Sequence, residues 1–200
     1  MTLTISAASA AELPALLPVL ARLRIRVFRD WPYLYDGDLD YEERYLSTFA
    51  KSAGAIVVLA RDGNEIVGAA TGVPLGEHDP AFASPLVAAG YDPGDIFYCA
   101  ESVLLPDYRG LGAGHAFFDQ REAAARAQGC KYSSFCAVIR SPDHPARPPE
   151  YRPLDSFWKK RGYTPIANTI VHYTWRDLGG SSETEKPMQV WIKSLVAEIG

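Results

Sequence analysis

The apolar run at residues 96–105 limits what this chain can fold into more than any other segment. Its side chains are mostly apolar at odd and even positions alike, so a strand formed here needs cover on both faces. Such a strand lies in the middle of a sheet with helices on both sides. Glu101 is the one carboxylic acid within the run, and burial of an unpaired carboxylate costs several kcal/mol. We therefore expect Glu101 to be paired or to have a function.

The remaining segments predict an α/β chain in which strands and helices are interspersed. Further strands are predicted at residues 3–5, 55–60, 66–73, 132–139, 166–175 and 186–194. Helices are predicted at residues 13–27, 41–49, 85–89, 113–128 and 154–161. No repeat or linker divides the chain, so we expect one domain over residues 1–200, built on a mixed sheet.

The first predicted helix carries a charge within its apolar face. Ser9 and Glu12 have the spacing of a capping box, in which the serine is the N-cap. Arg24 falls in the middle of the face that the leucines of this helix form. A guanidinium there is either paired inside the core or directed into a cleft, and the sequence leaves both open.

Net charge and composition exclude several classes of protein. The net charge of -4, from 20 basic and 24 acidic residues, argues against nucleic acid and against an anionic membrane as partners. No apolar run approaches the roughly 20 residues of a membrane span, and the first 21 residues lack Lys and Arg. We therefore expect a cytoplasmic protein without a secretory signal. Cys99, Cys130 and Cys136 form no C-x-x-C pair, which indicates buried thiols in a reducing compartment. The 4 histidines lack metal-ligand spacing, so no metal is expected.

A glycine-rich turn joins the central strand to the helix at residues 113–128. Arg109 is followed by Gly110, Gly112 and Gly114, so backbone N–H groups are able to converge on one point. The helix N-terminus behind them adds a partial positive charge, which favours a phosphate or pyrophosphate. The P-loop pattern is absent because no Lys-Ser or Lys-Thr follows, and the G-x-G-x-x-G spacing of dinucleotide-binding folds is not met.

This turn resembles the signature of the GNAT superfamily of acyl-CoA-dependent N-acetyltransferases. Residues 109–114 (RGLGAG) match its Q/R-x-x-G-x-G/A pattern, and residues 103–108 (VLLPDY) resemble the lead-in to it. Residues 157–163 (FWKKRGY) resemble a later segment that joins a helix to a strand. The resemblance implies a single-domain fold with about seven strands in a mixed sheet. It also implies that the sheet is split between the central strands at 96–105 and 132–139 and flanked by helices.

The resemblance further implies that acetyl-CoA lies in this split as the acyl donor. By similarity, backbone groups of Val103, Leu104 and Leu105 pair with the pantetheine arm. The pyrophosphate is then held by the turn, through Arg109, Gly110, Leu111, Gly112, Ala113, Gly114 and His115.

Glu101 is the candidate for the proton transfer that acyl transfer to an amine requires. We expect it to act as the base or to position the amine, and an ion pair with Arg24 is an equally weighted alternative. In many members of the family the acid lies nearer the start of this strand, where Tyr98 and Ala100 stand here. Strict alternation puts Glu101 on the opposite face from both, unless the strand bulges.

The acid that protonates the leaving thiolate departs from the pattern of the family. Members often have Tyr at the second aromatic of the segment 157–163, where this chain has Trp158. An indole N–H does not give up its proton at ordinary pH. Tyr151, about two helical turns upstream, is the substitute that we predict.

The acceptor is expected beside the aromatic and acidic stretch that follows the first helix, because this region borders the acceptor site in the family. The candidate substrate-binding residues are Arg24, Trp31, Tyr33 and Tyr35. Aromatic faces interleaved with carboxylates favour a cationic amine. The opposite preference, for an acceptor with a carboxylate, follows from Arg140, Arg147 and Arg152. The sequence does not decide between the two.

The resemblance thus implies an N-acetyltransferase that moves an acetyl group from acetyl-CoA to a primary amine of a small molecule or peptide by direct attack. The alternative is a non-catalytic acyl-CoA-binding sensor or regulatory domain, which Trp158 in place of Tyr leaves open. The last predicted strand, at 186–194, allows pairing across a homodimer, although nothing in the sequence requires it.

Overall fold

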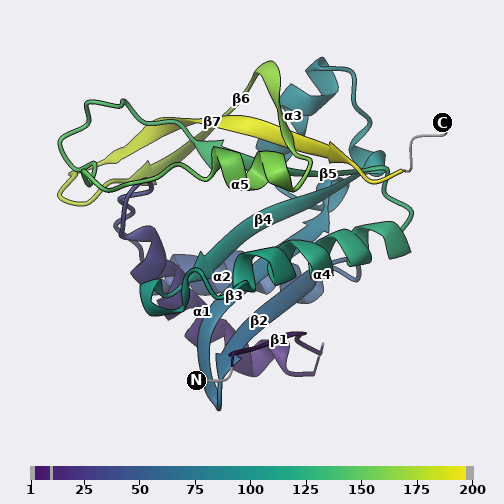
Figure 1. The fold of residues 1–200 in the computed structure, drawn as a ribbon, viewed down its shortest axis with the longest axis horizontal. Helices are drawn as coiled ribbons and strands as arrows, with labels where there is room; N and C mark the ends of the chain where they lie inside the picture. Colours follow the sequence, from purple (N-terminus) through teal and green to yellow (C-terminus); the bar gives the residue numbers. More distant parts are fainter. Residues whose placement is uncertain (1–2, 10, 197–200) are drawn as a thin grey trace.

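The computed structural model describes residues 3–9 and 11–196, which form one seven-stranded sheet with flanking helices. The strands are β1 (Leu3–Ala7), β2 (Ile56–Asp62), β3 (Glu65–Pro74), β4 (Ile96–Leu104), β5 (Tyr132–Val138), β6 (Thr164–Arg176) and β7 (Glu183–Ser194). They lie in the order β1-β2-β3-β4-β5-β7-β6 (Figure 1). β4 and β5 are parallel, and the other neighbours are antiparallel. The expected mixed sheet is therefore confirmed.

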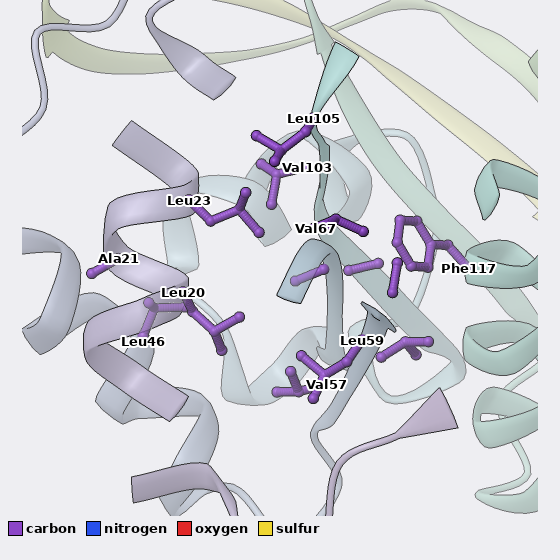
Figure 2. Packing of buried hydrophobic residues seen from close by; sticks show 14 of the residues in the cluster. Leu20, Ala21, Leu23, Leu46, Val57, Leu59, Val67, Val103, Leu105 and Phe117 are labelled. Atoms are coloured by element: carbon purple, nitrogen blue, oxygen red, sulfur yellow. The ribbon is translucent and has the colours of Figure 1, made fainter. Parts of the chain in front are cut away.

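Helices cover both faces of the first strands. The α-helices in the described residues are α1 (Leu13–Phe28), α2 (Leu39–Lys51), α3 (Pro80–Ala88), α4 (Ala113–Ala127) and α5 (Asp155–Lys160). α1 and α2 lie on one side of the sheet and α4 lies on the other (Figure 1). Figure 2 shows Leu20 and Leu23 on the α1 side of Val67 and Val103, while Phe117 approaches from α4. All five side chains are buried, as an apolar central strand requires.

The sheet opens between β4 and β5. Ile96 pairs with Tyr132 and Tyr98 with Ser134, and the pairing of the two strands ends there. β4 continues to Leu104, so its edge toward β5 has no strand partner over these last residues in the described part of the chain. Figure 1 shows the two strands together at one end and apart at the other. The expected split is confirmed, and it leaves backbone groups of β4 available to a ligand.

A β-bulge in β4 changes the face to which Glu101 points. Thr71 of β3 pairs with Glu101, and Val73 pairs with Tyr98, so two residues of β4 lie opposite one residue of β3. The extra residue reverses the alternation, and Glu101 joins Tyr98 on the face covered by α1. The sequence predicted that Glu101 and Tyr98 share a face only if this strand bulges, and the bulge is present.

The N-cap of α1 and the start of α3 differ from those expected. The prediction that Ser9 is the N-cap of α1 is wrong, because the helix begins at Leu13 with a proline in its first turn, where proline is favoured. The Glu12 carboxylate still accepts the N–H and the hydroxyl of Ser9, each at 2.8 Å. The helix expected at 85–89 begins earlier, at Pro80, because the Asp79 side chain caps it.

Candidate active site

A cavity of about 1040 Å³ lies on the α1 side of β4, between α1, α2, α3 and the long strand β6. Tyr98, Ala100 and Glu101 all line it, because the bulge brings them to one face. Of the residues predicted to contact the acceptor, three line the cavity, namely Arg24, Tyr33 and Tyr35.

The lining of the cavity combines aromatic rings with negative charge. Nine Phe, Tyr and Trp side chains contribute to it, together with seven carboxylates and three arginines. The carboxylates exceed the arginines by four, and the whole chain has a net charge of -4. The negative charge of the protein is therefore concentrated around this cavity.

Glu101 belongs to a buried charge network at the cavity wall. Its Oε2 atom lies 2.7 Å from Nη1 of Arg24 and accepts a hydrogen bond from the Tyr45 hydroxyl at 3.0 Å. Nε of Arg24 also donates to Glu42, which is fully buried, so two carboxylates share one guanidinium. Oε1 of Glu101 is buried and has no hydrogen-bond partner in the described residues. The expected ion pair between Arg24 and Glu101 is present, and it leaves one carboxylate oxygen free.

Tyr45 acts as a donor in this network. Its burial, and then the charge of Glu101, raise the pKa of the Tyr45 hydroxyl well above its ordinary value. The hydroxyl therefore keeps its proton and donates it in the hydrogen bond to Glu101. Tyr45 was not singled out as a partner of Glu101 from the sequence, because the contact joins α2 to β4 across more than fifty residues.

Arg121 of α4 holds the bulge from the opposite side of the sheet. Its Nη1 atom donates to the main-chain oxygens of Glu101 at 3.0 Å and Thr71 at 3.2 Å. Nη2 donates to the Ser102 hydroxyl at 2.9 Å, and the residue is only 1% exposed. The bulge interrupts the ladder between β3 and β4, and Arg121 supplies donors to carbonyl groups at that point. Sequence reasoning missed Arg121, although a lone arginine close to Phe117 on an apolar helix face was a usable signal.

His78 lies on the wall of the same cavity, just after β3. Its ring stacks on Tyr98 with centroids 4.8 Å apart, and Phe82 and Phe49 lie at 4.9 Å and 6.2 Å. Burial lowers the pKa of His78 below its ordinary value, so the imidazole is neutral at pH 7. Sequence reasoning considered His78 only as a metal ligand, because the rings that surround it come from three separate elements.

Trp31 and Tyr151 lie together, apart from the lining of the cavity. Their ring centroids are 5.9 Å apart, and the His144 ring lies 5.2 Å from Trp31. Burial raises the pKa of Tyr151, so its hydroxyl is protonated at neutral pH. The structure does not bring Trp31 to the cavity wall beside Tyr33. An acceptor contact by Trp31 and proton donation by Tyr151 stay predictions.

Two of the three arginines that favoured a carboxylate on the acceptor have other partners. Arg140 donates to the main-chain oxygens of Pro32 and Tyr33 and forms a bidentate pair with Asp177, at 2.8 and 3.2 Å. Arg147 donates to the main-chain oxygen of Pro142 at 3.0 Å. Neither arginine lines the cavity.

The glycine-rich turn has a backbone that glycine alone adopts readily. Gly110 has a φ angle of +80° and Gly112 one of +88°, both in the left-handed region. α4 begins at Ala113, and no side chain caps its N-terminus among the described residues. The first N–H groups of α4 therefore remain available to an anion. Arg109 and Leu111 are exposed beside them.

Polar contacts hold α5 against the middle of α4, and an aromatic contact holds it against the start of that helix. Nη2 of Arg161 lies 2.7 Å from Asp119 and 3.1 Å from Glu122. The ring of His115 packs edge-on against Phe157, with centroids 4.9 Å apart. These contacts fix the wall beside the glycine-rich turn.

The residues expected to meet the pantetheine arm lie at the end of the split. Val103 pairs with Ala69 of β3, and Leu104 pairs with Gly68, on the edge of β4 that faces away from β5. The N–H of Leu105 donates to the oxygen of Val67 at 2.9 Å, also on that edge. The opposite edge is the one that the split leaves open.

Other groups offer little alternative chemistry. Cys99, Cys130 and Cys136 are buried and unpaired, and burial raises the pKa of Cys136 to about 12. No group of three or more potential metal ligands is found within residues 3–9 and 11–196. Across the same part of the chain, no helix combines the length and apolarity that crossing a membrane requires.

Comparisons with known proteins agree with this geometry. The chain matches the family model described as "Acetyltransferase (GNAT) family" over residues 21–149. No curated protein matches the chain.

Solved structures share the fold at low sequence identity. A protein of Salmonella typhimurium, solved with its cofactor acetyl-CoA, is 14% identical with a TM-score of 0.59, covering 100% of this chain and 98% of that chain. An aminoglycoside 6′-N-acetyltransferase complexed with coenzyme A is 16% identical with a TM-score of 0.60, covering 98% and 99%. A ribosomal-protein-alanine N-acetyltransferase of Brucella melitensis is 14% identical with a TM-score of 0.59, covering 96% and 99%. These likenesses establish the fold.

Proposed function

The chain belongs to the acetyltransferase (GNAT) family, and from this premise we propose that it moves the acetyl group of acetyl-CoA to a primary amine of a small molecule or peptide. One observation carries the proposal: the cavity and the open edge meet on the same strand, β4. Acetyl-CoA along the edge and an amine in the cavity would approach each other at the bulge. Holding two reactants in this way is a large part of catalysis of a bimolecular reaction.

The glycine-rich turn supports the binding of acetyl-CoA at the start of α4. The left-handed glycines and the uncapped N-terminus direct N–H groups outward, where they suit the pyrophosphate. We assign this role to the residues from Arg109 to Gly114 and to His115. We assign the pantetheine arm to Val103, Leu104 and Leu105, where backbone groups on the open edge at the end of β4 suit its amide groups, as an added strand would.

The cavity supports a cationic acceptor over one with a carboxylate. Oε1 of Glu101 is a buried, unpartnered acceptor in a wall with an excess of carboxylates, and it suits an ammonium group. Tyr33 and Tyr35 offer aromatic faces to the same cation. Arg140, the strongest sign for the opposite preference, is occupied by Asp177.

The reaction that we propose is direct attack by the neutral amine on the thioester carbonyl carbon. The new C–N bond forms, the C–S bond breaks, and coenzyme A leaves as a thiolate. Glu101 positions the amine, and Tyr151 supplies a proton to the thiolate. Cys136 has too high a pKa to serve as a nucleophile, and direct attack requires none.

A non-catalytic acyl-CoA sensor is the second candidate, and the surroundings of Trp158 favour it. The Trp158 ring packs against Phe135 and Trp191, with centroids 5.0 and 5.1 Å away. It therefore serves in packing, and its indole N–H does not protonate a leaving thiolate. A sensor would bind acetyl-CoA and release no thiol in the presence of amines.

Thermal unfolding with four ligands tests the cofactor assignment. We expect CoA and acetyl-CoA to raise the Tm and ATP and NADP to leave it unchanged, since a ligand stabilises the folded state to which it binds. A rise with ATP or NADP and none with CoA would contradict the proposal.

Thiol release from acetyl-CoA with a panel of amines then separates the enzyme from the sensor. The panel pairs each cationic amine with a matched amine that carries a carboxylate. We expect turnover with members of the first set, with greater kcat/KM than for their acidic partners. Binding of acetyl-CoA without thiol release for any amine would favour the sensor.

A further inference from the structure

His78 is the one imidazole of the cavity wall, and the function proposed so far leaves it without a role. It follows the short 3-10 helix Leu75–Glu77 and packs against rings from α2, α3 and β4. Its ring nitrogens have no hydrogen-bond partner in the part of the chain that the structure describes. A ring held firmly in place, with free nitrogens on an acceptor cavity, is suited to proton transfer.

Glu101 is poorly suited to that transfer, even though it lies in the same wall. Its Oε2 atom already faces Arg24 and the Tyr45 hydroxyl. These two contacts occupy Oε2, so this oxygen has no free position from which to take a proton from the acceptor. Its free oxygen is better suited to hold an ammonium group by a charge-assisted hydrogen bond.

Resting on the proposed function, we infer that His78 is the base that removes the proton from the ammonium group of the acceptor. Glu101 holds the cation, and His78 takes its proton from within the same cavity. The two tasks fall to two residues because one must stay charged while the other must accept a proton.

The charges around His78 fit this division. Burial among the rings favours the neutral imidazole before the reaction, and Arg24 acts in the same direction. Glu101 of β4 and Asp79, next to α3, act in the other direction and stabilise the imidazolium once it forms. The rings of Phe49, Phe82 and Tyr98 complete its surroundings.

One proton passes from the R–NH3+ group to a nitrogen of His78 and leaves a neutral amine. The amine attacks the thioester, the C–N bond forms and the C–S bond breaks. The nitrogen loses its second proton to water, and the thiolate receives one proton from Tyr151, which regains a proton from water. The imidazolium returns its proton to water at the mouth of the cavity, so one proton is released for each acetyl group transferred.

The test is the pH profile of His78→Phe, which keeps a ring in the aromatic pocket and removes both nitrogens. Using the amine that the wild type turns over best, we expect kcat/KM at pH 7 to fall about 100-fold or more. The loss should shrink as the pH rises toward the pKa of the amine, because the free amine then needs no base. His172→Gln, at an exposed histidine of β6 that pairs with Glu185, is the control and should match the wild type at every pH.

His78→Ala gives a second, independent readout. Added imidazole should restore part of its activity, as a base that fits the vacated space. A wild type that binds acetyl-CoA but releases no thiol contradicts the proposed function itself. If the wild type is active, either of two results overturns the role of His78 alone. One is a ratio of kcat/KM between His78→Phe and the wild type that stays constant with pH, and the other is no rescue of His78→Ala by imidazole.

Discussion

Nη1 of Arg121 donates to the main-chain oxygen of Glu101 over 3.0 Å, from the side of the sheet opposite to the cavity. The same guanidinium also binds the main-chain oxygen of Thr71, the partner of Glu101 on β3. The direction of the Glu101 side chain therefore depends on a residue of α4 that does not line the cavity. Arg121 is a positioning residue for the acceptor site.

Replacement of Arg121 tests this relationship. Arg121→Met leaves two buried carbonyl groups without these donors, which costs roughly 2–5 kcal/mol of unfolding free energy. Arg126→Met is the control, because Arg126 on the same helix is half exposed and lies 3.8 Å from Glu122. Its loss should cost less than about 0.5 kcal/mol. Urea denaturation measures both, and equal effects would show that Arg121 does not hold the bulge.

The readout specific to positioning is the KM of Arg121→Lys for each of its two substrates. A lysine keeps a positive charge and part of the donor capacity, so part of the stability returns, but it lacks the fork that binds four oxygens at once. A displaced Glu101 would then raise KM for the amine more than it changes KM for acetyl-CoA.

The charge network predicts opposite results for its two ends. Glu101→Gln should lower kcat/KM for a cationic amine about 100-fold and change the stability by less than about 1 kcal/mol, because Arg24 keeps its pair with Glu42. Arg24→Met leaves two buried carboxylates without their cation and should cost about 3–5 kcal/mol. Thiol release and urea denaturation of both variants check this. Large destabilisation by Glu101→Gln with turnover retained would reduce Glu101 to a structural role.

The parts of the fold that the sequence predicted depend on local patterns. Two segments could be predicted because the residues of each one are enough to determine its backbone conformation. They are the apolar run that forms β4 and the glycine-rich turn with its left-handed Gly110 and Gly112. Boundaries were less reliable. β7 begins at Glu183, three residues before the predicted start, because Glu183 pairs with Arg176 across the hairpin and that pairing has no local signal.

The site was harder to predict because its geometry comes from distant contacts. The sequence offered Arg24 as a partner of Glu101, and the structure contains that pair. It treated a bulge as the condition for Glu101 to share a face with Tyr98 and Ala100, yet nothing local distinguishes a bulged strand from a regular one. Arg121 and His78 were missed for the same reason, since each acquires its role from elements more than fifteen residues away.

The glycine-rich turn predicts a loss of cofactor binding that is separable from a loss of stability. Alanine at Gly112, with φ of +88°, is strained by about 1–2 kcal/mol and displaces the N–H groups at the start of α4. Gly129→Ala is the matched control, because Gly129 follows the other end of α4 with φ of +76° and equally open space around it. Both variants should lose similar stability, and only Gly112→Ala should raise the Kd for CoA, by about tenfold or more. Calorimetric titration with CoA measures the difference, and equal Kd values would remove the turn from the cofactor site.

The pH dependence of stability gives a test of His78 that needs no substrate. Burial lowers the pKa of His78 in the folded chain below its value of 6.5 in the unfolded chain, so the unfolded state binds more protons between the two values. His78 therefore favours the folded state fully above pH 6.5, and this contribution falls as the pH drops through the pKa of the folded chain. His78→Phe removes it, so the unfolding free energy of the variant should decline less between pH 7 and 5 than that of the wild type. His172→Gln, which removes an exposed imidazole, should follow the wild type. Parallel curves for His78→Phe and the wild type would mean that the folded chain holds His78 with an unshifted pKa, and burial among the rings would then not be what keeps the imidazole neutral.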